Sequence, residues 1–317
     1  MNSKLPVDFI EKIKNIYSKE DLEICNKWFE IEKRKTVFRV NTLKTNSDEV
    51  LKTLKDNNLE VSKVDFLENA FILENGIEKD LWDLSIFEKW HIYMQSISSQ
   101  LPVNLLNIKE WQRILDITAA PWGKTSQLSE KLNNTGKIIA NDNNAIRIEK
   151  LNFTLKRQGC TNVEVLKSDA RNIKNDNPLY IEYFDHIVAD LPCSAEWKFN
   201  INREKSFGFW DTLVVKRNYR LQKQILENTI DLLKIWWELI YSTCTISPEE
   251  NEAIIHMLLC NFPQLELEDI KIDYKNSRDW ILEYWKQRFK KEISKTKRIL
   301  PSEESEWFFI AKLKKVS

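Results

Sequence analysis

The chain is poor in glycine, with five glycines in 317 residues, where a share of about 7% is usual. It has five scattered cysteines, and no two of them stand at the spacing of metal ligands. Their odd number argues against a disulfide framework, so we expect free thiols in a reducing compartment. The three histidines, His91, His186 and His256, are isolated in the sequence, so we expect structural histidines and no metal site.

Long apolar runs and an excess of one charge are also absent. No apolar run approaches the roughly 18–20 residues of a membrane span, and the N-terminal segment lacks the apolar core of a signal peptide. Lysine plus arginine and aspartate plus glutamate each number 48, so the net charge is zero. This balance excludes a protein held on nucleic acid by bulk charge but allows a local basic groove. We expect a cytoplasmic monomer that makes no membrane contact.

Apolar segments alternate with helical patterns from about Trp111 onward. Strands are predicted over residues 114–117, 137–140, 163–166, 184–189 and 239–242, and helices over 125–132, 145–157 and 221–233. This alternation predicts an α/β domain with a parallel sheet and helices on both faces. Residues 1–92 show a mixed pattern, with helices over 9–16 and from Ser47 and strands over 37–41, 59–64 and 70–73. They predict a small α/β domain before a larger one over 93–317.

Four aspartates stand at or just after predicted strand ends: Asp116, Asp142, Asp169 and Asp190. Ligands of parallel sheets bind at the carboxyl ends of strands, so these side chains should gather on one rim. The loop 118–125 after the first of these strands has small residues and leads into a helix N-terminus, which favours an anion. Asp142 follows about 20 residues later in the sequence, the spacing at which such folds place a carboxylate that hydrogen-bonds a ribose. The pattern predicts a nucleoside-cofactor site, while the missing spaced glycines exclude a phosphate-binding P-loop.

Two cysteines also stand at strand ends, in Asp190-Leu191-Pro192-Cys193-Ser194 and Ser242-Thr243-Cys244-Thr245. Composition alone favours small buried apolar side chains at both positions. Their position favours a second interpretation, because both thiols would face the same rim as the aspartates. A thiolate there could act as a nucleophile.

Motifs in the same order as in a known family extend this interpretation. The chain resembles the Sun/Fmu/Nop family of RNA cytosine-5 methyltransferases, which use S-adenosylmethionine, from about Arg34 to Lys315. The resemblance is carried by the segments 39–44, 93–100, 119–125, 190–194, 242–244, 248–252 and 308–313. It implies a class I, Rossmann-like methyltransferase domain over 93–317, an N-terminal substrate-binding extension over 1–92, and rRNA or tRNA as the partner.

The resemblance implies which residues hold the cofactor. The methionine end would lie on the loop formed by Thr118, Ala119, Ala120, Pro121, Trp122, Gly123 and Lys124. Asp142 would bind the ribose with support from Arg147, and Asp169 would lie on the adenine side. Asp190 would border both the cofactor and the target base.

The resemblance also implies catalytic roles. Cys244 would add to carbon 6 of cytosine, which makes carbon 5 nucleophilic, and Asp190 would stabilise charge near nitrogen 3. Cys193 would help to release the methylated product, and Lys124 would orient either thiol.

The same resemblance suggests contacts with RNA outside the catalytic residues. An RNA track would include Arg34, Lys35, Arg39 and Lys44, for which a solvated charged face is an equally good interpretation. A substrate loop over 198–216 would present cations and aromatic side chains to splayed bases, namely Lys198, Arg203, Lys205, Phe207, Phe209 and Trp210.

Two other functions stay open at this stage. A DNA cytosine-5 methyltransferase also carries Pro-Cys after its fourth strand, and there the nucleophile would be Cys193 rather than Cys244. A catalytically inactive RNA-binding or assembly protein would not need Cys244.

Tryptophan is abundant, with twelve residues, and several stand where the family has glycine: Trp90, Trp111, Trp122, Trp197, Trp236, Trp237 and Trp307. Trp236 and Trp237 are expected in a turn before the fifth strand. A side chain at Trp122 would fill ligand space that glycine leaves open. One hypothesis explains both abnormal counts: a UGA codon read as glycine in some bacterial lineages has been translated as tryptophan. The alternative is an authentic degenerate relative that binds the cofactor poorly.

Overall fold

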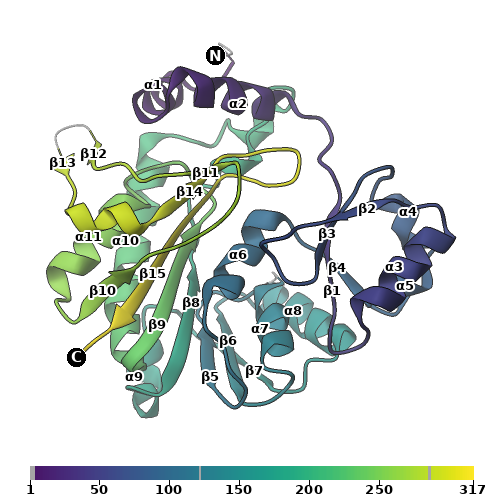
Figure 1. The fold of residues 1–317 in the computed structure, drawn as a ribbon. Helices are drawn as coiled ribbons and strands as arrows, with labels where there is room; N and C mark the ends of the chain where they lie inside the picture. The colour runs from purple at the N-terminus through teal and green to yellow at the C-terminus, as the bar shows by residue number, and fades with distance from the viewer. Residues whose placement is uncertain (1–3, 121–122, 285–286) are drawn as a thin grey trace.

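The computed structural model describes residues 4–120, 123–284 and 287–317. Pro121 and Trp122 of the predicted cofactor loop therefore lie outside the described residues. A large sheet occupies the centre of the molecule, a smaller α/β unit lies beside it, and two N-terminal helices cover one end (Figure 1). Within the described ranges, no helix is long and apolar enough to cross a membrane.

Within the described residues the large sheet has nine strands, and five consecutive ones are parallel in the order β9-β8-β5-β6-β7, with β7 at one edge. Their bounds are β5 (Arg113–Asp116), β6 (Lys137–Asp142), β7 (Val163–Lys167), β8 (Phe184–Asp190) and β9 (Leu233–Thr243). Antiparallel strands extend the β9 edge, with β15 (Phe308–Lys315) beside β9, then β14 (Lys297–Ile299) and β11 (Ser277–Arg278), while β10 (Leu265–Glu268) also pairs with β15. In a separate two-stranded sheet, β12 (Glu283–Tyr284) pairs antiparallel with β13 (Gln287–Arg288).

Alternating side chains of these strands enter two hydrophobic cores, one on each face. Leu115 and Ile187 pack with α10 (Thr212–Thr229) and α11 (Glu252–Asn261), whereas Ile114 and Val188 pack with α6 (Ile97–Leu105) and α7 (Lys124–Lys131). The remaining helices of this part are α8 (Ala145–Gln158) and α9 (Ile173–Asp176). This two-sided burial follows from the period of two along a strand. It confirms the predicted Rossmann-like parallel sheet with helices on both faces.

One stretch of the prediction is wrong. The helix expected over 221–233 ends at Thr229, and β9 begins at Leu233, six residues before the predicted strand. Trp236 and Trp237 therefore lie inside β9 rather than in a turn. The pairing of β8 with β9 shifts register between Phe184 and His186, which accommodates the extra residues as an irregularity of the strand. The periodicity alone did not show this irregularity.

The small unit is an antiparallel sheet in the order β2-β3-β1-β4. Its strands are β1 (Val37–Val40), β2 (Val61–Lys63), β3 (Ala70–Leu73) and β4 (Ile92–Met94), and its helices are α3 (Ser47–Asp56), α4 (Lys79–Trp82) and α5 (Ser85–Glu88). Asn46, rather than Ser47, caps α3, because its side chain accepts a hydrogen bond from the Glu49 amide. This sheet confirms the small α/β unit expected in the N-terminal part.

The two N-terminal helices pack on the side of the molecule that holds the large sheet. Phe9 of α1 (Val7–Ile16) lies 4.8 Å from Phe199 and 5.4 Å from Trp210 between ring centroids. Helix α2 (Lys19–Glu30) adds Trp28 and Phe29 to the same core. The domain boundary at residue 92 stays a prediction.

Three tryptophans have left-handed backbone, with φ angles of 60° at Trp90, 70° at Trp111 and 74° at Trp236. Trp111 and Trp236 are 77% and 65% exposed, so burial of the indole does not offset this strain. A left-handed conformation costs a residue with a Cβ roughly 1–2 kcal/mol, whereas glycine adopts it freely. The local backbone at these positions therefore favours glycine.

We expect Trp111→Gly to raise the free energy of unfolding by about 1 kcal/mol, because relief of backbone strain exceeds the added chain entropy of glycine. Urea unfolding followed by circular dichroism measures this change. Trp82→Gly is the matched control: Trp82 is also exposed but ends a helix without positive φ, so glycine there should lower stability by up to about 1 kcal/mol. Equal losses in both variants would contradict the strain argument.

Candidate active site

A cavity of about 350 Å³ opens at the carboxyl ends of the parallel strands. Its wall combines the loops after β5, β8 and β9 with the segment that follows β4. The predicted site residues that line it are Thr118, Gly123, Lys124, Arg147, Asp190, Cys193 and Cys244. The structure therefore brings both cysteines, the lysine and the aspartate of the fourth parallel strand into one cavity.

Lys124 and Asp190 form an ion pair at the base of the cavity. Lys124 begins α7, is 4% exposed, and places its Nζ 2.7 Å from Asp190 Oδ2 and 3.1 Å from Ser99 Oγ. The other carboxylate oxygen of Asp190 accepts a hydrogen bond of 2.8 Å from Ser242 on the neighbouring strand. The Asp190 side chain is thus fixed from two sides and stays one-fifth exposed.

The two thiols touch, with 3.1 Å between Cys193 Sγ and Cys244 Sγ. Cys193 follows β8 and Cys244 follows β9, and these strands are parallel neighbours. The hydrogen bond to Cys244 and the burial of the side chain raise the pKa of Cys193 well above its usual value. Cys193 therefore stays a neutral thiol beside Cys244.

A buried polar cluster behind the thiols joins their two loops. Glu250 accepts hydrogen bonds from the Ser194 amide, the Ser194 hydroxyl and Gln222. Glu196 accepts from Thr245, Ser247 and the indole of Trp210, and one of its oxygens lies 2.8 Å from the Ser194 hydroxyl oxygen. Burial raises the pKa of Glu250 well above its usual value, so it stays protonated. Sequence reasoning assigned no role to these glutamates, although Glu250 lies in the quoted segment 248–252.

The predicted cofactor residues lie along the same edge. Asp142 ends β6, is 2% exposed, and accepts a hydrogen bond from the Asn144 amide. Arg147 donates to the carbonyl of Ala120 and places its Nη2 3.3 Å from Asp142 Oδ2, as its supporting role requires. Ala119, also in this loop, is buried.

Asp169 follows β7 at the next strand end and is held by Arg171, which donates to both carboxylate oxygens. This arginine lowers the pKa of Asp169. Asp142 and Asp169 do not line the cavity that holds the thiols, so the structure places them beside it along the rim.

Gly123 meets a steric requirement in the cofactor loop. A Cβ at this position would lie 2.2 Å from Cε1 of Tyr93, a contact that would force the ring to move. Because Gly123 has no side chain, Tyr93 and the segment 93–99 that it begins can pack against the start of α7.

Some predicted RNA-contact residues have structural roles instead. Arg39 is 2% exposed and pairs with Glu130 of α7, while it also donates to Ser126 and Gln158, so it cannot belong to a surface RNA track. Phe207 and Trp210 are each 5% exposed in the core with α1, so they do not stack on bases. The predicted RNA contacts of Arg39 and of Phe207 and Trp210 were therefore wrong. The charge or aromaticity of a residue does not show which side chains far away in the sequence will cover it.

The other predicted contacts lie on the surface. Lys198 lines the cavity and Phe209 is 48% exposed. Arg34 donates to Glu306, Lys35 pairs with Glu74, and Lys44 donates to the carbonyl of Lys89. Their contact with RNA stays a prediction.

Asp116 is the fourth aspartate of the rim and is fully buried at the end of β5. It accepts a hydrogen bond of 2.7 Å from Thr125, yet burial raises its pKa to about 7. Lys124 counteracts this shift, whereas Asp190 and Asp142 increase it. The strand register places Asp116 beside Ala140 and Val188, two residues before Asp142 and Asp190, so the three carboxylates lie near the same edge of the sheet.

Asp116 should make stability depend on pH. The folded state holds a proton that the unfolded chain releases above pH 4, so this contribution is complete below pH 4 and is lost as pH rises to 7. Wild type should lose up to about 1.4 kcal/mol per pH unit relative to Asp116→Asn in this window. Chemical unfolding at a series of pH values measures the difference.

Asp169→Asn serves as the control for this experiment. Because Arg171 lowers the pKa of Asp169, its stability difference from wild type should stay constant between pH 5 and 7. A pH-independent difference for Asp116→Asn as well would contradict the raised pKa.

Comparisons with known proteins agree with this geometry. A profile of the family described as 16S rRNA methyltransferase RsmB/F matches residues 103–314, and a profile of its ferredoxin-like domain matches residues 6–79. The tRNA (cytosine(49)-C(5))-methyltransferase of Pyrococcus abyssi is 32% identical over 88% of this chain and 87% of its own length. Ribosomal RNA small subunit methyltransferase F of Shewanella piezotolerans is 29% identical over 88% of this chain and 57% of its own length.

The chain spans about half the length of several such relatives, including 46% of the 25S rRNA (cytosine-C(5))-methyltransferase nop2 of Schizosaccharomyces pombe, which is 30% identical over 90% of this chain. A methyltransferase homologue from Pyrococcus horikoshii superposes with a TM-score of 0.83 at 29% identity, covering 97% of this chain and 94% of its own. The structure of NSun6 from the same organism with SFG has a TM-score of 0.80 at 23% identity and 98% coverage of both chains, and it supports the fold. The chain therefore belongs to the RsmB/F methyltransferase family, whose relatives named here are RNA cytosine-C5 methyltransferases and whose members use S-adenosylmethionine.

Proposed function

We propose that this protein transfers a methyl group to carbon 5 of a cytosine in RNA through a covalent adduct on Cys244. The observation that carries the proposal is the contact of two thiols, 3.1 Å apart, beside the Lys124–Asp190 pair. A single thiol would suffice for addition, but a second thiol at this position can also serve the elimination that must follow.

The first step assigns different roles to the two sulfurs. Cys244 is the nucleophile, as the family resemblance of the segment 242–244 implies, and its sulfur forms a bond to carbon 6 of the base. Cys193 starts as the neutral thiol, because its hydrogen bond to Cys244 and its burial raise its pKa. Negative charge then develops near nitrogen 3. Asp190 would approach this edge of the ring, and the Lys124 ammonium, 2.7 Å from Asp190, offsets the added charge.

The elimination step uses a change in Cys193. The largest cause of its raised pKa is the hydrogen bond to Cys244, and this interaction ends when the Cys244 sulfur is bonded to carbon 6. The Cys193 pKa then falls, its proton passes to solvent, and the resulting thiolate takes the proton from carbon 5. The electron pair of that C–H bond re-forms the double bond between carbons 5 and 6. The bond between Cys244 and carbon 6 breaks, and the thiolate is restored.

The residues present fit S-adenosylmethionine. Carboxylates at the ends of β6 and after β7, Asp142 and Asp169, suit the ribose hydroxyls and the adenine side, and the absence of a side chain at Gly123 keeps the loop close to Tyr93. Thr118, Ala119, Ala120 and Arg147 complete this side of the site. When bound, the cofactor supplies an electrophilic methyl group.

The relatives named above act on two kinds of RNA, transfer RNA and ribosomal RNA. The relative named as a tRNA (cytosine(49)-C(5))-methyltransferase is matched over 87% of its own length. The two ribosomal RNA enzymes named above are matched over only 46% and 57% of theirs. Unmodified tRNA is therefore the first substrate to test, with ribosomal RNA second. The segment Ser242-Thr243-Cys244 favours the RNA-type assignment over the DNA-type one, in which Cys193 would attack.

We expect Cys244→Ala to abolish methylation, because no nucleophile remains. Cys193→Ala should retain addition but fail in elimination, so that a covalent protein–RNA adduct accumulates. Transfer of tritiated methyl groups measures the first effect, and a shift on a denaturing gel measures the second. Cys260→Ala, at an exposed cysteine outside the cavity, is the control and should behave as wild type.

An adduct that forms with Cys244→Ala but not with Cys193→Ala would reverse the two roles and support the DNA-type mechanism. Full methylation by Cys244→Ala would overturn the proposed reaction.

A further inference from the structure

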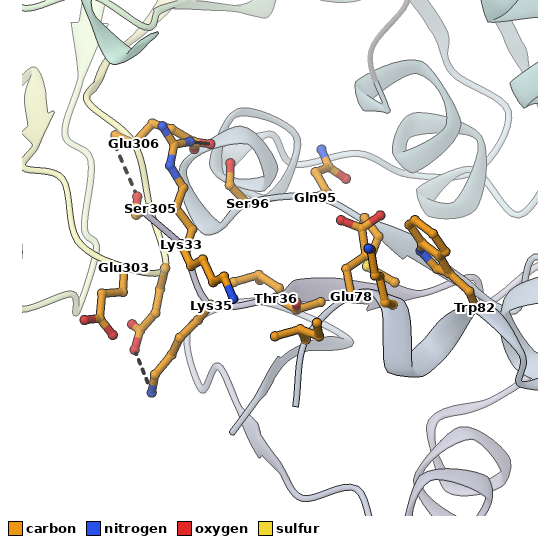
Figure 2. A pocket seen from close by; sticks show the side chains of 16 residues that line it. Lys33, Lys35, Thr36, Glu78, Trp82, Gln95, Ser96, Glu303, Ser305 and Glu306 are labelled. Atoms are coloured by element: carbon orange, nitrogen blue, oxygen red, sulfur yellow. Dashed lines mark hydrogen bonds and ion pairs between the residues drawn. The ribbon is translucent and has the colours of Figure 1, made fainter. Parts of the chain in front are cut away.

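A second, larger cavity of about 530 Å³ lies beside the active site, between the small sheet and the loop before β15. Its walls are the segments 33–37, 77–79, 94–96 and 303–306, together with Trp82. Figure 2 shows Trp82 at one end of this cavity and Glu303 at the other, with Lys33 between them. Its volume falls in the range of roughly 300–1,000 Å³ that is typical of small-ligand sites.

This side cavity shares part of its wall with the active-site cavity. Met94, Gln95, Ser96 and Glu306 line both. Glu306 is fixed in this shared wall, because Arg34 Nη1 lies 2.8 Å from its Oε1 and Ser98 donates to its Oε2. The side cavity is therefore adjacent to the active-site cavity.

The side chains of this cavity include groups that are free to bind a ligand. Lys33 and Lys79 form no ion pair with any described residue, and neither do Glu78 and Glu303. Trp82 is 46% exposed, and Lys79 Nζ lies 6.0 Å from the centre of its ring. An exposed aromatic face with free cations beside it suits a base and its phosphate, while free carboxylates can accept hydrogen bonds from exocyclic amino groups.

We propose that this cavity binds the nucleotide next to the target cytosine, with its base stacked on Trp82 and its phosphate near Lys33 or Lys79. This inference rests on the proposed function, because it takes RNA as the substrate. It assigns recognition of the neighbouring base to the small N-terminal unit and chemistry to the large one.

Trp82→Ala tests the stacking contact. Loss of one base–aromatic contact should weaken binding of an RNA substrate roughly tenfold, while kcat at saturating RNA stays near that of wild type. Two further RNAs lack the base on the 5′ or on the 3′ side of the target cytosine. With one of them, Trp82→Ala and wild type should bind equally, because the contact is already lost.

Trp111→Ala is the matched control, since Trp111 is also exposed but precedes the opposite end of β5. Unchanged affinity of Trp82→Ala, or a loss that persists with both abasic RNAs, would overturn the proposed subsite. Binding is measured by filter retention without cofactor, so failure of the subsite is distinct from failure of methylation by wild type.

The left-handed tryptophans support a second inference independently. Trp90, Trp111 and Trp236 have φ between 60° and 74°, whereas Trp82, Trp197, Trp210, Trp237 and Trp307 have none in this region. Left-handed positions usually carry glycine, yet three of them carry tryptophan in a chain that has only five glycines. Both facts are explained if tryptophan stands in the place of glycine at these positions. We infer that the natural protein carries glycine at residues 90, 111 and 236, encoded by UGA.

Sequencing of the source DNA and peptide mass spectrometry of the natural protein test this inference. UGA at the three left-handed positions, UGG at Trp210, and peptide masses that contain glycine are expected. UGG at the three positions, or tryptophan in the peptides, would overturn it.

Discussion

The buried ion pair between Lys124 and Asp190 holds the candidate site together. Lys124 belongs to the helix that follows the cofactor loop, and Asp190 ends the strand that leads to Cys193. Its ammonium also reaches Ser99 and lies 5.5 Å from the centre of the Phe308 ring. Four segments thus meet at one charge. Removal of either partner would leave the charge of the other without its ion-pair partner. This usually lowers the free energy of unfolding far more than the loss of a surface ion pair does.

The parallel sheet was predictable because each strand is short, apolar and followed by a polar residue. Ile114 and Leu115 are buried on opposite faces, so a continuous apolar run was the correct signal for a strand covered on both sides. Once the strands are parallel, Asp116, Asp142 and Asp190 must end at the same edge. The gathering of the site followed from topology, before any side-chain geometry was known.

Predictions from charge alone were less successful. Arg39 stands in a strand near other cations, which favours a basic surface, but its partner Glu130 is 91 residues away. Nothing in the local sequence indicates that pairing. The same holds for Phe207 and Trp210, whose neighbour Phe9 comes from the start of the chain. Long-range packing decides whether an arginine or an aromatic residue faces solvent, and periodicity does not contain that information.

The sulfur contact depends in turn on groups that take no part in the proposed chemistry. Cys193 and Cys244 come from separate loops, and Ser194 and Thr245, the residues that follow them, meet at Glu196 and Glu250. Because burial keeps Glu250 protonated, this cluster carries less charge than two carboxylates would suggest, and it can remain close to a thiolate without strong repulsion. Two thiols that act in succession on one base need such a support, since a small shift of either loop would separate them.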